Sequence, residues 1–142
     1  MTRWLFDTGP LVAYLNARDP AHEAVAELLE DFNGQLYTTG AVLTEAMYFV
    51  SSSPLGPRLL SEFVTSAGVQ IFDLAQPPAL RAATRLMETY SDTPMDYADA
   101  TLVLLAERLK CFDILTLDRR GFSTYRATRN RTFRLVLDTH SS

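Results

Sequence analysis

The sequence contains a single cysteine, Cys111, and two histidines, His22 and His140. One cysteine cannot form a disulfide within the chain. Neither histidine is spaced from Cys111 as the ligands of a zinc site would be. The sequence therefore disfavours both a disulfide framework and a zinc centre.

Long apolar runs are also missing. The N-terminal segment MTRWLFD reaches a charged residue after three apolar ones, which is too few for the core of a signal peptide. No run approaches the roughly 20 residues of a membrane span. We therefore expect a cytoplasmic protein without membrane contact. A chain of 142 residues with 47% hydrophobic content predicts one globular domain, residues 1–142.

Positive charge is scarce but unevenly distributed. The formal net charge of −4 argues against a simple nucleic-acid-binding module, which usually carries a basic footprint. Six of the 13 basic residues nevertheless follow Asp118, where Asp138 is the one acid. Such a segment can face a polyanion, or it can simply be solvated. The candidates for nucleic-acid contact are Arg119, Arg120 and Arg126.

Short apolar runs alternate with amphipathic segments along the chain. The pattern predicts strands at 3–6, 35–39, 69–74, 113–117 and 133–137, and helices at 10–16, 19–34, 40–52, 58–68, 77–90 and 93–109. In the helix at 19–34, Asp19 is the expected N-cap. Apolar strands that alternate with helices predict an α/β fold, a three-layer α/β/α sandwich with a mainly parallel central sheet.

Two aspartates lie near the start of the apolar helix TPMDYADATLVLLAERL, at 93–109. Thr93 is a natural N-cap, and Asp96 three residues later completes a capping-box pattern, so we expect a mainly structural Asp96 with a supporting role as the alternative. Asp99 is expected beyond the first turn, on the apolar face with Met95 and Leu102. No cap explains it there, which favours a functional role that requires a cation.

Three further acids lie where a parallel sheet would bring them together. Asp7 and Asp118 each follow a predicted strand, where either could be an ordinary N-cap, and Glu45 lies early in the apolar helix at 40–52. The carboxyl ends of parallel strands share one edge with the following helix starts, so these acids and Asp99 can converge.

Four converging carboxylates would take up protons rather than ionise together, unless hard cations neutralise them. Ligation by oxygen alone suits Mg²⁺ or Mn²⁺. Such an ion bridges phosphate oxygens and lowers the pKa of a bound water. The acids therefore predict metal-dependent phosphate chemistry.

Four segments resemble the acidic motifs of a known family in order and spacing: WLFDTGPLVAYLN, LTEAMY, MDYADATLVLLAERL and ILTLDRRGF. They are similar to those of PIN-domain ribonucleases, specifically the VapC-type toxins of type II toxin–antitoxin pairs. The resemblance implies a PIN-like fold and a Mg²⁺- or Mn²⁺-dependent endoribonuclease that hydrolyses RNA with metal-activated water. It also implies that the catalytic, metal-binding acids are Asp7, Glu45, Asp99 and Asp118, with Thr8 and Thr116 as supporting hydroxyls.

The same resemblance implies partners. VapC-like proteins form homodimers and bind a small cognate antitoxin, so we expect both, with the apolar segments AMYFV and LLSEFV as a docking surface. Alternatively, these side chains fill the core. Gly121 stands where many relatives carry an acid, which leaves a further carboxylate contribution open.

Other functions fit the residues less well. A phosphate-receiving signalling domain needs a lysine at a later strand end, whereas the single lysine, Lys110, lies at a predicted helix end. A two-carboxylate glycosidase gives no reason for a fourth acid. A PIN-like adaptor that binds RNA or a partner without cleavage remains an open alternative.

Overall fold

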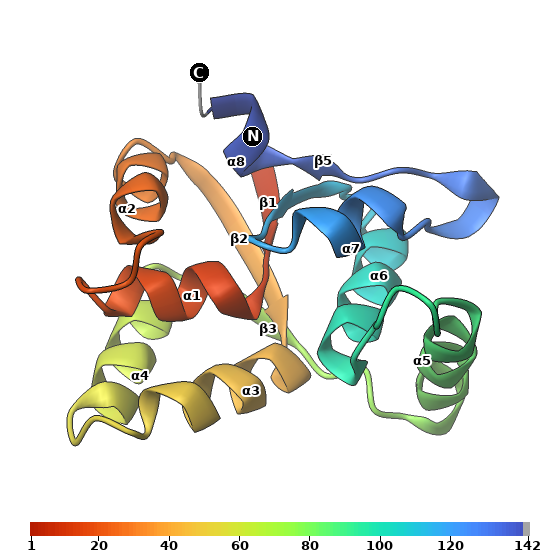
Figure 1. Ribbon diagram of the computed structural model, residues 1–142, viewed down its shortest axis with the longest axis horizontal. Helices are drawn as coiled ribbons and strands as arrows, with labels where there is room; N and C mark the ends of the chain where they lie inside the picture. The colour runs from red at the N-terminus through yellow and green to blue at the C-terminus, as the bar shows by residue number, and fades with distance from the viewer. Residues whose placement is uncertain (141–142) are drawn as a thin grey trace.

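A parallel five-stranded sheet forms the centre of the protein, seen in a computed structural model that describes residues 1–140 (Figure 1). The strand order is β3-β2-β1-β4-β5, and each neighbouring pair is parallel. The strands are β1 (Thr2–Phe6), β2 (Gly34–Thr39), β3 (Gln70–Phe72), β4 (Asp113–Leu115) and β5 (Arg134–Leu135). Of the single domain expected at 1–142, residues 141–142 lie outside the described part.

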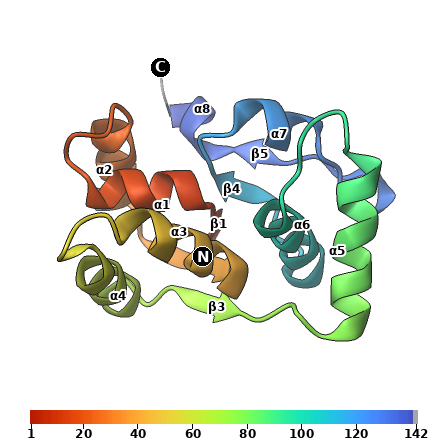
Figure 2. The same cartoon turned by 60° about the horizontal axis from the view of Figure 1, so that its bottom comes forward.

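Helices cover both faces of the sheet (Figures 1 and 2). One face carries α1 (Thr8–Leu15), α2 (His22–Glu30), α3 (Gly40–Val50), α4 (Gly56–Ser66) and α8 (Val136–His140). The other carries α5 (Pro77–Thr89), α6 (Tyr97–Leu109) and α7 (Arg119–Thr124). The predicted three-layer α/β/α sandwich is therefore confirmed. Within the described residues, no helix combines the length and the apolarity needed to cross a bilayer.

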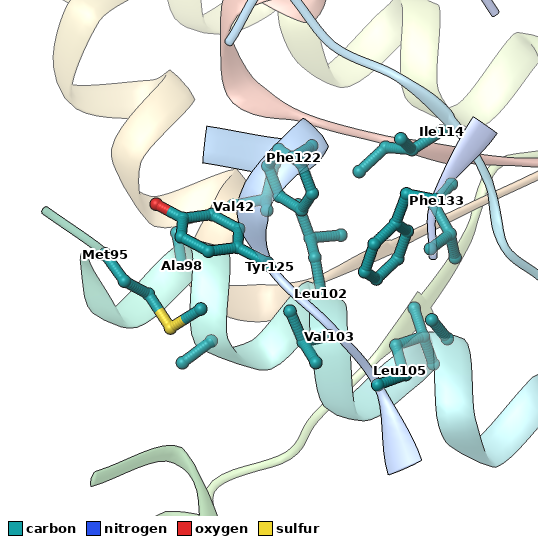
Figure 3. Close-up of a cluster of buried hydrophobic side chains, with 14 of the residues drawn as sticks. Val42, Met95, Ala98, Leu102, Val103, Leu105, Ile114, Phe122, Tyr125 and Phe133 are labelled. Atoms are coloured by element: carbon teal, nitrogen blue, oxygen red, sulfur yellow. The ribbon is translucent and has the colours of Figure 1, made fainter. Parts of the chain in front are cut away.

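The two cores follow from the alternation of side chains along β1. Trp4 and Phe6 pack on the face of α1 to α4, whereas Leu5 packs on the face of α5 and α6. Figure 3 shows the second core, in which α6 meets the aromatic rings of Phe122 and Tyr125, whose centroids are 5.1 Å apart. This packing places α6 against the sheet and carries its first turn to the carboxyl ends of the strands.

Several expected boundaries were wrong. α2 begins at His22, because the Asp19 carboxylate accepts a hydrogen bond from the Ala21 amide in the preceding turn and does not cap the helix. The strand expected at 133–137 shortens to Arg134–Leu135, since Val136 turns away into α8 and is buried in the opposite core. The helix α7 and the 3₁₀ turn at Thr128–Asn130 were not expected.

Candidate active site

Asp7 lies at the carboxyl end of β1 and is held on both carboxylate oxygens. Its Oδ1 accepts a hydrogen bond from the Thr8 amide at 2.8 Å, which caps α1, and its Oδ2 accepts one from the Thr116 hydroxyl at 2.7 Å. The Asp7 amide donates to the Leu115 carbonyl at 3.0 Å, linking the ends of β1 and β4. The side chain is buried, with 7% of the residue exposed. Asp7 is therefore both the expected N-cap and a fixed, buried acid.

Thr116 connects Asp7 to Asp118. Its hydroxyl donates to Asp7 and accepts a hydrogen bond from the Asp118 amide at 3.0 Å. Asp118 in turn caps α7, since its Oδ1 accepts from the Gly121 amide at 2.9 Å. The hydroxyl of Thr116 therefore positions two acids.

Gly121 provides the space that Asp118 occupies. A Cβ at this position would collide with the Asp118 carboxylate and would lie 2.9 Å from the Tyr125 hydroxyl. Any side chain at 121 therefore requires Asp118 to move, which gives a physical reason for glycine in place of a further acid.

Asp96 and Asp99 cap α6 reciprocally. The Asp96 Oδ1 accepts from the Asp99 amide at 2.8 Å, and the Asp99 Oδ2 accepts from the Asp96 amide at 3.1 Å. Two expectations are corrected by this capping box: the N-cap is Asp96 rather than Thr93, and Asp99 has a capping role in the first turn. The two acids differ in burial, because Asp96 is exposed and Asp99 is half-buried, and their division into a structural and a functional residue stays a prediction.

Hydroxyl groups hold the α6 N-terminus against the sheet edge. The Thr101 and Thr39 hydroxyls are 2.9 Å apart, and Thr39 also caps α3 by accepting from the Val42 amide. The Tyr125 hydroxyl donates to the Pro94 carbonyl at 2.9 Å, just before the capping box. These three hydroxyls were not among the expected site residues, although the two consecutive threonines at the end of β2 were a possible signal.

The acids act on one another electrostatically. Burial raises the pKa of Asp7 to about 6, with further contributions from the charges of Asp96 and Asp118, against the lowering effect of the Thr116 and Thr8 hydrogen bonds. Burial, followed by the charges of Asp7 and Asp96, raises the pKa of Asp99 to about 8. Burial and then the charge of Asp96 raise the pKa of Glu45. All five carboxylates therefore belong to one electrostatic cluster.

The residue types in this cluster fit a hard divalent cation. Every side-chain donor is an oxygen, and the raised pKa values of Asp7 and Asp99 show that the cluster lacks compensating positive charge. The buried Thr8 hydroxyl lies beside the Glu45 carboxyl group, and its interaction with that group partly offsets the rise in the pKa of Glu45. As the side chains stand, however, no three His, Cys, Asp or Glu residues within the described chain form a metal-binding group. An ion held by one or two of these carboxylates would complete its coordination with water, as Mg²⁺ usually does.

The three candidate arginines differ in what they contact. Arg119 forms an ion pair with Asp138, with the two side chains 2.8 Å apart. The Arg126 guanidinium donates to the carbonyls of Ser123, Thr124 and Tyr125 at the end of α7, which is a structural role. Arg120 is exposed on α7. Contact between nucleic acid and Arg119, Arg120 or Arg126 stays a prediction.

Lys110 lies far from the acids. It ends α6 in the left-handed conformation, with φ 53°, and lines a hollow with Thr2 and Arg3 at the amino end of β1. A phosphate-receiving domain would need its lysine at the carboxyl edge. The fold therefore removes the structural basis of that alternative.

Comparisons with known proteins identify relatives of the chain. A family model described as the PIN domain matches residues 4–127. The chain is 33% identical over 134 residues to Ribonuclease VapC26 of Mycobacterium tuberculosis strain H37Rv, with 93% of this chain and 98% of that protein covered.

Solved structures share the fold at low sequence identity. The crystal structure of VapC20 of M. tuberculosis, a toxin that cleaves the sarcin–ricin loop, superposes with a TM-score of 0.74 at 16% identity, covering 83% of this chain and 91% of that one. The VapBC2 complex of Rickettsia felis, bound to a DNA fragment from its promoter, gives a TM-score of 0.65 at 17% identity, covering 94% and 98%. At these identities, the likeness concerns the fold alone.

Proposed function

The chain belongs to the PIN-domain family, and we propose that it is a metal-dependent endoribonuclease, the toxin of a toxin–antitoxin pair. The relationship to Ribonuclease VapC26 along nearly the whole of both chains supports this activity. The observation that carries the proposal is the carboxylate cluster at the carboxyl edge of the sheet, where burial and mutual repulsion raise the pKa values of Asp7 and Asp99. A site of this kind requires a cation, and RNA is the substrate implied by the relative.

PIN-domain VapC ribonucleases depend on divalent metal ions. In this chain Asp7, Glu45, Asp99 and Asp118 would hold the ion, and we propose Mg²⁺ or Mn²⁺ because all the donors are oxygens. Asp96 joins this set, since its charge acts on Asp7, Glu45 and Asp99. When bound, the cation supplies the positive charge that polarises the scissile phosphodiester and activates a water.

The chain's own groups orient these acids. Thr116 and the Thr8 amide fix both oxygens of Asp7, and each oxygen keeps a lone pair for a further partner. The capping box fixes Asp96 and Asp99 relative to each other. The buried Thr8 hydroxyl lies beside Glu45 and can help to orient its carboxyl group.

The partners are a small antitoxin and a second copy of the chain. Four large apolar side chains are exposed on α3, α4 and the turn that joins them: Tyr48 at 78%, Phe49 at 52%, Leu55 at 60% and Leu59 at 47%. Exposed apolar residues of this size usually mark protein interfaces. The fold relationship to a toxin–antitoxin complex supports an antitoxin partner. An arginine or lysine of that antitoxin would compete with the cation for the acids.

The proposed RNA substrate also favours a cytoplasmic location.

Cleavage assays test the enzymatic proposal. Wild-type protein should cut single-stranded or looped RNA with Mg²⁺ or Mn²⁺, and activity should vanish in excess EDTA and in Asp7→Asn. Asp31→Asn, a change at an exposed acid that ends α2 at the opposite edge of the sheet, is the matched control. Undiminished cleavage in EDTA would contradict the proposal, and metal-independent RNA binding without cleavage would favour the adaptor alternative.

Association is tested separately from cleavage. Light scattering of the isolated chain should give a dimer at tens of micromolar, and co-expression with a small protein encoded immediately upstream should restore growth and give a co-purified complex. A monomer would exclude the dimer at that concentration. Failure of both rescue and co-purification would withdraw the toxin role and leave the ribonuclease.

A further inference from the structure

A hollow of about 440 Å³ lies at the edge of the sheet opposite the acids. It opens around the amino end of β1 and the segment that joins α6 to β4. Its lining includes Arg3, Lys110, Phe112, Asp113, Arg131 and Arg134. These residues come from three distant parts of the sequence, so the fold alone brings them together.

The charges that line the hollow are mostly positive. Arg3, Lys110, Arg131 and Arg134 face a single carboxylate, Asp113, which already accepts from the Arg134 Nε at 2.9 Å. Three cationic side chains are therefore not balanced by an acid in the lining. This excess stands out in a chain whose formal net charge is −4.

Two guanidinium groups are held in place by neutral partners. Arg3 donates to the carbonyls of Leu109 and Lys110, at 3.0 and 3.2 Å, where α6 ends. Arg131 lies over the Phe112 ring, 4.0 Å from its centroid. Carbonyls and aromatic rings orient a guanidinium without neutralising its charge, and each group keeps N–H donors for another acceptor. Both cations are thus preorganised for an anion.

We propose that this hollow binds phosphate groups of the RNA backbone, as a second contact away from the site of cleavage. Arginine and lysine are the usual ligands of backbone phosphates, and the open shape admits a chain rather than an enclosed small molecule. Arg3 lies on β1, and Asp7 directly follows the strand four residues later, a distance of about 13 Å of extended chain. An RNA of several nucleotides therefore has the length to reach both edges. The inference rests on the proposed ribonuclease function for its ligand.

The test removes two charges without touching the acids. Lys110→Asn/Arg131→Gln is compared with Arg81→Gln/Arg85→Gln, which removes the same charge from exposed positions on α5. Asparagine suits the left-handed backbone at Lys110. Binding of a labelled 20-nucleotide single-stranded RNA is measured in EDTA by fluorescence anisotropy across a salt series.

We expect Lys110→Asn/Arg131→Gln to bind the RNA about tenfold more weakly than wild type. The slope of log binding constant against log salt concentration should be smaller in magnitude by about 1.4, because each contact with a single-strand phosphate contributes about 0.7. The α5 control should bind within about twofold of wild type. If the double variant fails to fold, Lys110→Asn alone should reduce the slope by about 0.7. Equal slopes for wild type, control and hollow variant would overturn the proposal.

A free anion is the other source of the same chemistry. Titration of inorganic phosphate, followed by NMR of the backbone amides at 110–113, reports binding of the small anion. If the hollow binds inorganic phosphate but the double substitution leaves the salt dependence of RNA binding unchanged, the proposal that RNA occupies the hollow is overturned. The cleavage assay separates the two proposals, because RNA binding that depends on Lys110 and Arg131 without any cleavage would reject the ribonuclease and retain the hollow.

Discussion

Replacing Asp7 with asparagine should stabilise the metal-free protein at neutral pH. The pKa of Asp7 is about 6 in the folded protein, compared with 3.8 for the free side chain. Asp7 therefore keeps its proton to a higher pH in the folded state than in the unfolded state. Protonated Asp7 contributes stability in full below about pH 4, and this contribution is lost as the pH rises through 6. At 1.36 kcal/mol per pH unit, the ionised form costs about 3 kcal/mol in a site that is fully buried.

Asparagine avoids this cost but changes one hydrogen bond. It caps a helix as well as aspartate does, so the bond from the Thr8 amide should persist. The new amide group would face the Thr116 hydroxyl, which now donates to Asp7, and reversing that bond costs about 1 kcal/mol. The free energy of unfolding of Asp7→Asn should then exceed that of wild type by about 2 kcal/mol at pH 7.5. At pH 4.5 the difference should be close to zero, because ionisation of Asp7 has cost wild type only about 1 kcal/mol of stability at that pH.

Thermal melts by circular dichroism in EDTA measure this difference. For a chain of this size, we expect Tm to rise by about 6–8 °C at pH 7.5, with little change at pH 4.5. Asp31→Asn should shift Tm equally at both pH values. A gain of the same size at both, or a loss at pH 7.5, would refute the electrostatic explanation. Added Mn²⁺ should reverse the order, because only wild type gains stability from binding the ion.

Two further substitutions test the geometry of the cluster. Asp96→Asn should leave Tm nearly unchanged, because asparagine caps a helix as well as aspartate does. Like Asp99→Asn, it should lower Mn²⁺ affinity by about tenfold or more. Calorimetric titration measures this affinity, and an affinity equal to that of wild type would assign Asp96 a capping role alone. Gly121→Ala should cost about 1–3 kcal/mol and weaken Mn²⁺ binding, because the added Cβ displaces Asp118. Gly40→Ala, where a Cβ meets no atom within 4 Å, is the control and should not destabilise.

The sheet edge that carries the acids could be predicted because local sequence patterns determine it. Asp7 and Asp118 each follow an apolar strand and are followed by residues that start a helix, and both cap helices in the structure. Alternating strands and helices require a parallel sheet, which brings strand ends to one edge. That reasoning needed no knowledge of tertiary contacts.

The start of α6 could not be predicted in the same way. Thr93 with Asp96, and Asp96 with Asp99, are both acceptable capping pairs, so the sequence leaves two registers open. Tertiary contacts select the second: the Tyr125 hydroxyl holds the Pro94 carbonyl outside the helix, and Thr101 meets Thr39. Both contacts join residues more than 30 positions apart, beyond the reach of a local pattern.

Net charge alone does not show how the charges of this chain are distributed. The fold separates charges by edge, so that Asp7, Asp99 and Asp118 gather at the carboxyl ends of the strands, while Arg3 and Lys110 lie at the amino end. A formal charge of −4 describes neither edge, although it argued against contact with nucleic acid. RNA would be repelled by the acids until a cation is bound, whereas the proposed RNA contact at the basic hollow does not require the ion. The two edges should therefore respond differently to EDTA. Cleavage at the acids should be lost without the ion, whereas RNA binding at the hollow should be unaffected.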